Sequence, residues 1–282
     1  WIEYTSQPYA IKNFYKGYTA AHLSSGGVGD LPTDTSIDLA ANAETQGLKH
    51  YANHKNIRLI YIIVEVGYRI VANKASGITK LADLKGKKVR TFRGSSAEVF
   101  MDKMLASVGV PRNASTHVSG SVCMKAPCAS GTYPQLLASK QIDAFGLWEP
   151  IVELGLKAIG ENAAIFQNFS IYREVYSLYS TTEKLGNTKT RKDIVAFAKA
   201  LKQTSDVYVN KPELVYQYVA GLSGMDASVV QDVWPDHRWG NGTMPDDLLE
   251  FLVEEDAYLA KMDKRVGVSR ADLAKFIDTS VL

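Results

Sequence analysis

The sequence lacks an apolar run long enough to cross a membrane. A membrane-spanning helix needs about 18 or more consecutive apolar residues. The best candidate here runs from Ile57 to Val66, and it contains the charged residues Arg58 and Glu65. We therefore expect no membrane insertion.

An excess of charge of either sign is also missing. The chain has 32 Lys and Arg residues against 30 Asp and Glu residues, which gives a net charge of +2. Binding to nucleic acid or to an anionic membrane normally shows as a clear basic excess, so we expect neither as the main partner. At 282 residues, of which 46% are hydrophobic, the chain is long enough for two lobes of ordinary domain size.

Cysteine is scarce, since Cys123 and Cys128 are the only two in the sequence. They enclose a short loop that could close as a local disulfide, a bond that persists outside the reducing cytosol. Apart from His117, six residues before Cys123, no histidine lies near them, and this spacing does not suit a zinc site. We expect no metal and no cofactor.

Three sequons for N-glycosylation are present, at Asn113, Asn168 and Asn241, and each lies near turn-like residues. Short sequons also arise by chance, and two cysteines can stay reduced. The combination nevertheless favours a glycoprotein secreted from a eukaryotic cell. Because the chain begins at Trp1 rather than Met, we expect a processed or trimmed polypeptide.

The stretch from Ile78 to Val110 contains the most informative local pattern. A lysine-rich turn precedes a short strand from Lys88 to Phe92, and a helix follows Gly94 with Ser95 or Ser96 as its N-cap. Unpaired N–H groups at a helix start can receive an acceptor group from a ligand. The alternative is an ordinary strand, turn and capped helix, which many α/β proteins contain.

Polar residues follow other predicted strands, at the strand ends where open α/β sheets bind ligands. Ile37 to Ala41 leads to Glu44 and Thr45 at a helix start, where Glu44 can also simply complement the helix dipole. The buried strand Ile57 to Val66 ends at Glu65, for which Arg69 is an alternative, purely structural partner.

Two further segments have the same character. The strand from Gln141 to Leu147 ends at Trp148 and Glu149, which resemble a binding wall, although Trp at a helix start is often ordinary packing. Predicted strands at Ile2 to Thr5 and at Thr19 to Leu23 lead into polar turns. The second turn holds Ser24, Ser25 and two glycines, either a ligand loop or a flexible turn. From Thr188 onward the sequence predicts successive amphipathic helices.

The order of these motifs resembles that of type 2 periplasmic binding proteins. The resemblance covers most of residues 15 to 185. It is strongest to the group of nitrate, aliphatic sulfonate and taurine receptors and the fungal thiamine-pyrimidine synthase. The motifs that carry it are Ile37-Asp38-Leu39-Ala40, Asp83-Leu84-Lys85-Gly86-Lys87-Lys88-Val89, Gly94-Ser95-Ser96, Val108-Gly109-Val110 and Gln141-Ile142-Asp143-Ala144 before Trp148-Glu149-Pro150.

The resemblance implies an α/β fold of two lobes, each a mixed, mostly parallel sheet flanked by helices, with a ligand cleft between them and a helical C-terminal segment. Lobe I would comprise residues 1–72 and 178–282, and lobe II residues 73–177. The expected ligand-binding residues are Tyr4, Gln7, Ser24, Ser25, Glu44, Thr45, Glu65, Ser95, Ser96, Trp148, Glu149 and Tyr176.

Two functions follow from this resemblance. The first is an extracellular receptor for a polar small molecule, heteroaromatic, amine or sugar-like, because the candidate positions hold three carboxylates and only Arg93 as a cation. The alternative is a secreted enzyme that uses Glu44, Glu65 and Glu149 as general acid and base, as in glycoside hydrolysis.

The expected partner is the small-molecule ligand. Bacterial receptors of this group deliver to a membrane transporter, a partner that fits poorly with sequons and a disulfide. The pyrimidine synthase has a cysteine-rich motif that two cysteines do not match. We expect a monomer or a weak dimer.

Overall fold

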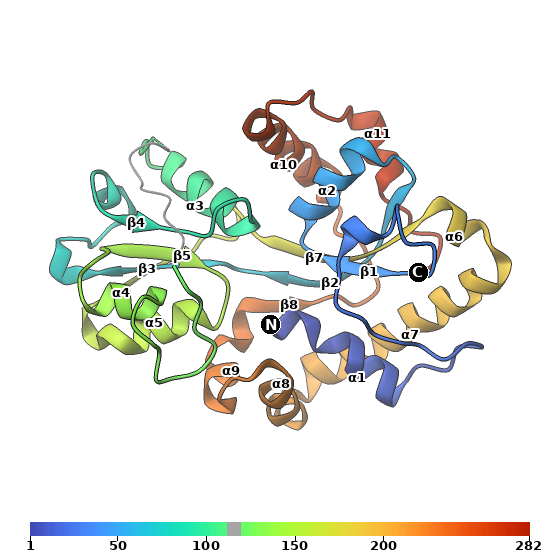
Figure 1. Cartoon of the computed structure of the whole chain (residues 1–282), viewed down its shortest axis with the longest axis horizontal. Coiled ribbons are helices and arrows are strands. Elements are labelled where there is room, and N and C mark those ends of the chain that lie inside the picture. The colour runs from blue at the N-terminus through green and yellow to red at the C-terminus, as the bar shows by residue number, and fades with distance from the viewer. Residues whose placement is uncertain (112–119) are drawn as a thin grey trace. The chain divides into compact units, whose positions relative to one another are not determined.

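The computed structural model describes residues 1–111 and 120–282 (Figure 1). The described chain divides into two compact units. Unit 1 comprises residues 1–2, 66–174 and 216–237, and unit 2 comprises residues 3–65, 175–215 and 238–282. The chain therefore passes between the units several times.

The sheet of unit 2 has four strands in the order β1-β7-β2-β8. They are β1 (Ala40–Asn42), β2 (Ile57–Val66), β7 (Glu174–Thr181) and β8 (His237–Trp239). Strand β1 runs antiparallel to β7, with Ala41 opposite Leu178. Strand β2 is buried along nearly its whole length, as its apolar sequence predicts.

Helices cover both faces of this sheet. They are α1 (Ser6–Asn13), α2 (Glu44–Asn53), α6 (Thr182–Gly186), α7 (Thr188–Asn210), α10 (Leu248–Asp263) and α11 (Arg270–Phe276), with 3-10 turns at Ile2–Tyr4, Val28–Asp30 and Pro212–Leu214. Helix α1 packs on α7, whereas α2 packs on α10. The N-cap of α7 is Asn187, whose side chain accepts hydrogen bonds from the amides of Lys189 and Thr190.

Two predicted strands are wrong. Ile2–Tyr4 forms a 3-10 turn, and α1 begins at Ser6 directly after it. Residues 19–23 are neither helix nor strand. The Asp193 carboxylate accepts hydrogen bonds from the amides of Tyr18 and Thr19, which are therefore engaged by a side chain rather than by a neighbouring strand.

The sheet of unit 1 has the order β4-β5-β3-β6. Its strands are β3 (Arg69–Asn73), β4 (Val89–Arg90), β5 (Ala144–Leu147) and β6 (Ala163–Phe166). Strands β4 and β5 are parallel, and β3 runs antiparallel to both β5 and β6. Strands β4, β5 and β6 therefore run in the same direction, and β3 runs in the opposite direction between β5 and β6. A helix connects β5 to β6, as parallel strands require.

The helices of unit 1 include α3 (Ser96–Ala106), α4 (Tyr133–Ala138) and α5 (Ile151–Ile159), with 3-10 turns at Lys74–Ser76, Leu81–Leu84 and Gly160–Asn162. Helix α3 covers one face of the sheet, and α4 and α5 cover the other (Figure 1). Gly146 and Gly155 make this packing close. A Cβ on Gly146 would meet Met101 of α3, and a Cβ on Gly155 would meet the ring of Phe145.

Residues 216–237 differ from the predicted lobe division. They form α8 (Tyr216–Ser223), α9 (Ala227–Val233) and a 3-10 turn (Trp234–Asp236), and they belong to unit 1 rather than to the first lobe. Val229 packs in one apolar cluster with Cys123 and Leu154. Asp232 pairs with Lys157 of α5 at 2.7 Å. These contacts hold the segment in unit 1.

Candidate functional site

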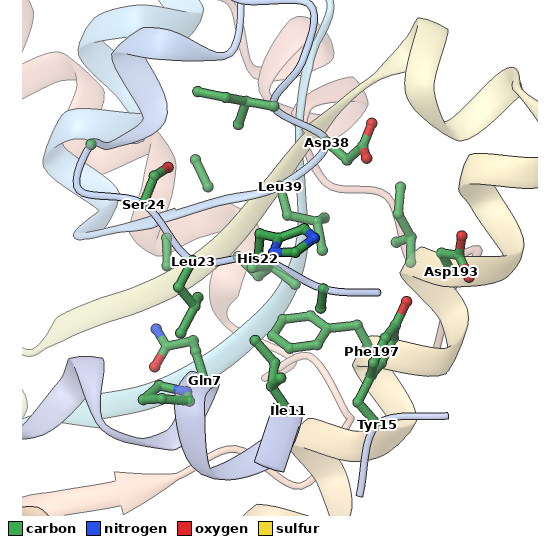
Figure 2. A pocket seen from close by; sticks show the side chains of 18 of the residues that line it. Gln7, Ile11, Tyr15, His22, Leu23, Ser24, Asp38, Leu39, Asp193 and Phe197 are labelled. Atoms are coloured by element: carbon green, nitrogen blue, oxygen red, sulfur yellow. The ribbon is translucent and has the colours of Figure 1, made fainter. Parts of the chain in front are cut away.

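Unit 2 contains a cavity of about 1030 Å³. Its walls are α1, residues 19–27, the chain from Ser36 to Ala41, strand β7 and helix α7. Figure 2 shows side chains from these walls around one space, with Gln7 and Ile11 from α1 and Asp193 and Phe197 from α7. The volume is just above the range of about 300–1,000 Å³ found for small-molecule sites.

Four aromatic side chains of tyrosine and phenylalanine contribute to the wall of this cavity. The rings of Tyr4 and Tyr176 have centroids 5.2 Å apart, and those of Tyr15 and Phe197 are 6.1 Å apart. The Gln7 side-chain amide lies 3.5 Å from the Tyr176 hydroxyl. A flat apolar ligand can therefore contact rings while neutral polar groups hold its edge.

The two carboxylates in the lining already have partners. Asp38 pairs with Lys184 at 2.8 Å. Asp193 accepts hydrogen bonds from the amides of Tyr18 and Thr19 at 2.6 and 3.3 Å. Burial and the neighbouring Asp193 charge raise the pKa of Tyr15 to about 12, so its hydroxyl stays protonated at neutral pH.

Residues 19–27 form the irregular wall of the cavity. One end of this segment is held by Asp193, and at the other end the Gly27 amide donates to the Asp30 carboxylate at 2.9 Å. Ser24 and Ser25 lie between these anchors and are exposed. Their hydroxyls are thus accessible at the cavity wall.

Five of the predicted site residues line this one cavity: Tyr4, Gln7, Ser24, Ser25 and Tyr176. They come from the 3-10 turn at Ile2–Tyr4, helix α1, the irregular segment and strand β7. Their role in ligand binding stays a prediction, and their shared position is the observation on which we build.

Three other predicted residues of unit 2 lie outside the lining. Glu44 is fully buried, and its carboxylate accepts a hydrogen bond from the Val175 amide at 2.7 Å, which fastens α2 to β7. The Thr45 hydroxyl is also buried, with no hydrogen-bond partner among the described residues. Glu65 is partly buried in β2. Within the structure, Glu44 therefore has a structural role.

The predicted serines of unit 1 lie at the start of α3. Ser95 is the N-cap: its hydroxyl accepts a hydrogen bond from the Ala97 amide at 3.2 Å and donates to the Phe92 carbonyl at 2.7 Å. The Ser96 hydroxyl is 3.0 Å from that of Tyr68. The capping interpretation therefore accounts for Ser95.

Trp148 belongs to an aromatic cluster in unit 1. Its ring centroid is 5.4 Å from Trp1, 5.8 Å from Phe92 and 6.4 Å from Tyr68. The neighbouring Glu149 is only 2% exposed and pairs with Arg69 at 2.7 Å. Arg69, offered by the sequence as a partner for Glu65, is thus engaged by Glu149.

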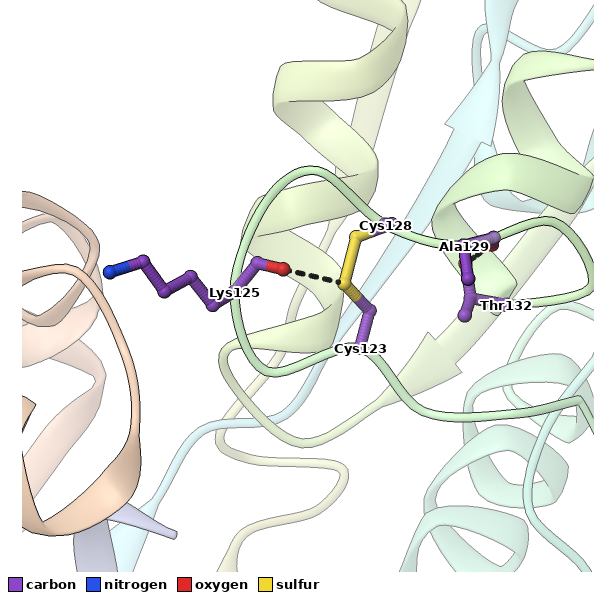
Figure 3. The surroundings of a disulfide bond; sticks show 5 residues. All are labelled: Cys123, Lys125, Cys128, Ala129 and Thr132. Atoms are coloured by element: carbon purple, nitrogen blue, oxygen red, sulfur yellow. Dashed lines mark hydrogen bonds between the residues drawn. A yellow bond between two sulfur atoms is a disulfide. The ribbon is translucent and has the colours of Figure 1, made fainter.

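The two cysteines form the predicted disulfide, Cys123–Cys128, with Cα atoms 5.7 Å apart (Figure 3). Asn168 and Asn241 are exposed, as glycan acceptors must be. Asn113 lies outside the described residues. Across the two described ranges, no group of three or more His, Cys, Asp or Glu side chains is placed to hold a metal ion, and no helix is long and apolar enough to span a membrane.

The sequence does not indicate that helix α7 lines a cavity. The sequence predicts α7 only as one of several amphipathic helices, and no pattern in it singles out Phe197, Asp193 or Tyr15. An apolar helix face has the same periodicity whether it packs on a core or lines a cavity. Nothing in the sequence pattern separates these two cases.

The two-unit α/β architecture is that of the type 2 periplasmic binding proteins. Residues 30–214, more than half of the chain, match the family described as NMT1/THI5 like, and the chain belongs to this family. No curated protein matches the sequence closely.

Several solved structures share the fold. An alkanesulfonate-binding protein from Xanthomonas axonopodis pv. citri has 17% identity and a TM-score of 0.65, covering 86% of this chain and 81% of that one. The ligand-binding component of an ABC-type import system from Staphylococcus aureus has 13% identity and a TM-score of 0.70, covering 99% and 93%. A conserved Candida albicans gene product has 14% identity and a TM-score of 0.64, also covering 99% and 93%.

Proposed function

We propose that this protein is a non-catalytic, exported receptor that binds a flat heteroaromatic small molecule in the cavity of unit 2. The observation that carries the proposal is the set of aromatic rings around one space of about 1030 Å³, with five of the sequence-derived candidates in its wall. Structural neighbours described as an alkanesulfonate-binding protein and as the ligand-binding component of an import system support a receptor rather than an enzyme.

The lining argues against a sulfonate or another strong anion. Its lining residues include no arginine, and Lys189 is the single lysine among them. Bidentate recognition of a sulfonate or carboxylate is normally the work of arginine. An alkanesulfonate ligand, which the Xanthomonas relative's description indicates, is therefore a poorer match for this lining.

The lining also separates the other ligand classes. An amine needs a carboxylate with spare capacity, but Asp38 and Asp193 already have partners. A sugar would find hydroxyls at Ser24 and Ser25, but aromatic and aliphatic side chains make up more than half of the lining, which favours a flatter and less polar ligand. A heteroaromatic ring uses both features of the site, because one of its faces can stack on the exposed ring of Tyr4 and its edge can bond to Gln7.

Catalysis by carboxylates is less well supported. Glu44 is bonded to the Val175 amide, and Glu149 is buried against Arg69. A general acid or base must be able to reach the substrate proton. Both groups are instead engaged in contacts that hold the fold together.

Export is supported by the disulfide and by the exposure of Asn168 and Asn241. The oxidised pair Cys123–Cys128 would persist outside the cytosol. We include secretion in the proposal for this reason.

Isothermal titration against pyrimidines, indoles, aromatic amines, alkylsulfonates and oligosaccharides tests the ligand class. We expect heteroaromatic compounds to bind and the other classes to bind at least about tenfold more weakly, equivalent to 1.4 kcal/mol. Tight alkylsulfonate binding without any heteroaromatic response would overturn the proposal.

A cavity-filling variant tests the location. Ala21 lines the cavity from its irregular wall, so Ala21→Trp should abolish binding without disturbing the sheet. Ala257 is exposed on α10 and outside the lining, so Ala257→Trp is the matched control and should bind normally. Unchanged binding in Ala21→Trp would place the ligand elsewhere.

A further inference from the structure

A cluster of buried and partly buried charges in unit 1 lies at two of the places where the chain enters and leaves that unit. The chain enters unit 1 at Val66, so residues 66–69 are the first of the unit at this point. It leaves unit 1 after His237, the residue that follows Asp236. The Gly67 amide donates to the Asp236 carbonyl at 2.9 Å, so these two connecting segments are bonded to each other inside unit 1.

Arg69 lies at these two connecting segments and contacts three carboxylates. Its guanidinium lies 2.7 Å from Glu149, 3.0 Å from Glu153 and 3.3 Å from Asp236. The Glu149 carboxylate also accepts a hydrogen bond from the Glu153 amide at 3.0 Å. One permanent positive charge is therefore shared among three acids.

The surrounding groups do not balance this charge. Lys157 is 3.7 Å from Glu153, but it lies closer, at 2.7 Å, to Asp232 of α9. Gln167, which is neutral, donates to the Asp236 carboxylate at 2.9 Å and to the Gly67 carbonyl at 3.0 Å. With every carboxylate charged, Arg69 and its three partners would carry a net charge of −2.

The three acids differ in their access to water. The side chain of Glu149 is 2% exposed, that of Glu153 8% and that of Asp236 16%. A surplus buried charge is relieved either by taking up a proton at the most buried acid or by moving the most exposed acid into water. Proton uptake would therefore occur at Glu149, and movement into water would occur at Asp236.

We propose that this cluster is a proton-dependent clamp, in which loss of a proton from Glu149 frees Asp236 from Arg69 and loosens the bonded segments at residues 66–69 and 236–237. While Glu149 is neutral, it still accepts a hydrogen bond from Arg69 but carries no charge, so only Glu153 and Asp236 balance the guanidinium charge. Once Glu149 is charged, it competes for the guanidinium from 2.7 Å, and the repelled Asp236 side chain hydrates.

The pKa of Glu149 places this change near neutrality. Burial raises its pKa to about 7, although the Arg69 charge and the hydrogen bond from Glu153 act in the opposite direction. The folded protein therefore holds this proton more tightly than the unfolded chain does. The stabilisation is complete below the usual Glu pKa and is lost as the pH rises through about 7, so the clamp is tight in mild acid and loose in mild base.

Hydrogen exchange of the Gly67 amide in the full chain tests the clamp without any ligand. After correction for the intrinsic rate, protection should fall about fivefold between pH 6 and pH 8, the effect of one partly exposed ion pair. Glu149→Gln removes the titration and should keep protection constant. An exposed acid on α10 gives the matched control, Glu250→Gln, which should behave as the wild type. Constant protection in the wild type, or an unchanged pH response in Glu149→Gln, would overturn the proposal.

Carbon-13 NMR of the Glu carboxyls in wild-type protein gives a second measurement, which needs no variant to fold. A Glu signal with a midpoint near 7, lost in Glu149→Gln or assigned through its neighbours, supports the clamp. Titration of Glu149 in the ordinary Glu range contradicts it. Neither result depends on whether the cavity of unit 2 binds a ligand.

Discussion

The rings of Tyr4 and Tyr176 lie with their centroids 5.2 Å apart and their planes tilted by 40°. Tyr176 is 3% exposed within β7, whereas Tyr4 is 47% exposed. The inner ring is therefore enclosed by the sheet, whereas nearly half of the outer ring's residue surface is exposed. Tyr4 is thus the member of this pair that a ligand can reach.

Tyr4→Ala should therefore weaken binding of a heteroaromatic ligand without unfolding the protein. The loss of one aromatic contact is worth about 0.5–1.5 kcal/mol, so we expect Kd to rise about threefold to tenfold by isothermal titration. Tyr4→Phe keeps the ring and should bind nearly as the wild type does. Equal affinity in all three proteins would show that Tyr4 does not contact the ligand.

Local sequence patterns predicted those elements whose environment is determined by nearby residues. The continuous apolar run of β2 predicts a buried strand, and the sequence predicts a helix cap at Ser95 or Ser96, of which Ser95 is the cap in the structure. The disulfide followed from two cysteines close in sequence. In each case the interacting residues are close in sequence, or the run of apolar residues itself indicates that the strand is buried.

The missed features depend on partners distant in sequence. The Asp193 carboxylate accepts a hydrogen bond from the amide of Tyr18, 175 residues away. The adjoining segment from Thr19 to Leu23, for which the sequence predicts a strand, is irregular. Arg69 has Asp236 as a partner, and no local pattern indicates that pair. Helix α9 is amphipathic, but periodicity does not say which unit its apolar face covers.

Asp193→Asn should loosen the irregular wall of the cavity. The charged acceptor of the Tyr18 and Thr19 amides would be lost, a change worth about 1 kcal/mol at this partly exposed position. Hydrogen exchange at Tyr18 should therefore rise about fivefold at pH 7. Asp206→Asn is the control, because Asp206 is an exposed acid on the same helix and pairs only loosely with Lys202.

The same contact has a defined pH dependence. Burial alone would raise the pKa of Asp193, but hydrogen bonds from the Thr19 side chain, from the Tyr18 and Thr19 amides and from Tyr15 outweigh it and lower the pKa. Its contribution is present above the usual Asp pKa and is lost as the pH falls through the depressed value. Wild type and Asp193→Asn should therefore differ at pH 7 and converge in strong acid. A constant difference at all pH values would contradict this account.

Expression in a secreting eukaryotic cell should add glycans at Asn168 and Asn241. Both residues are exposed and lie in tight turns, since the Asn168 side chain accepts from the Ser170 amide and that of Asn241 from Thr243. Asn168→Gln and Asn241→Gln should each remove one glycan, visible as a mass decrease by intact mass spectrometry. Asn162 is exposed but has no Ser or Thr two residues later, so Asn162→Gln should leave the glycan mass unchanged. A chain that is secreted without any glycan at these sites would refute the prediction.

Removing the disulfide should weaken the packing of residues 120–133 on α9. The bond joins residues five apart, and closing so short a loop stabilises by about 2 kcal/mol in the chain-entropy account. Cys123 also packs with Leu154 and Val229. The double variant Cys123→Ser and Cys128→Ser should therefore lower the free energy of local opening by about 2 kcal/mol, measured by hydrogen exchange in α9.

Reduction of the wild-type disulfide should reproduce this effect, because it breaks the same covalent link without changing any other residue. Lys125, within the loop, pairs with Asp226 at 2.9 Å, but both side chains are largely exposed. An exposed ion pair contributes little, so Lys125→Ala should change the exchange of α9 by less than about twofold. If Lys125→Ala were as destabilising as the double cysteine variant, the ion pair rather than the covalent bond would hold the loop on α9.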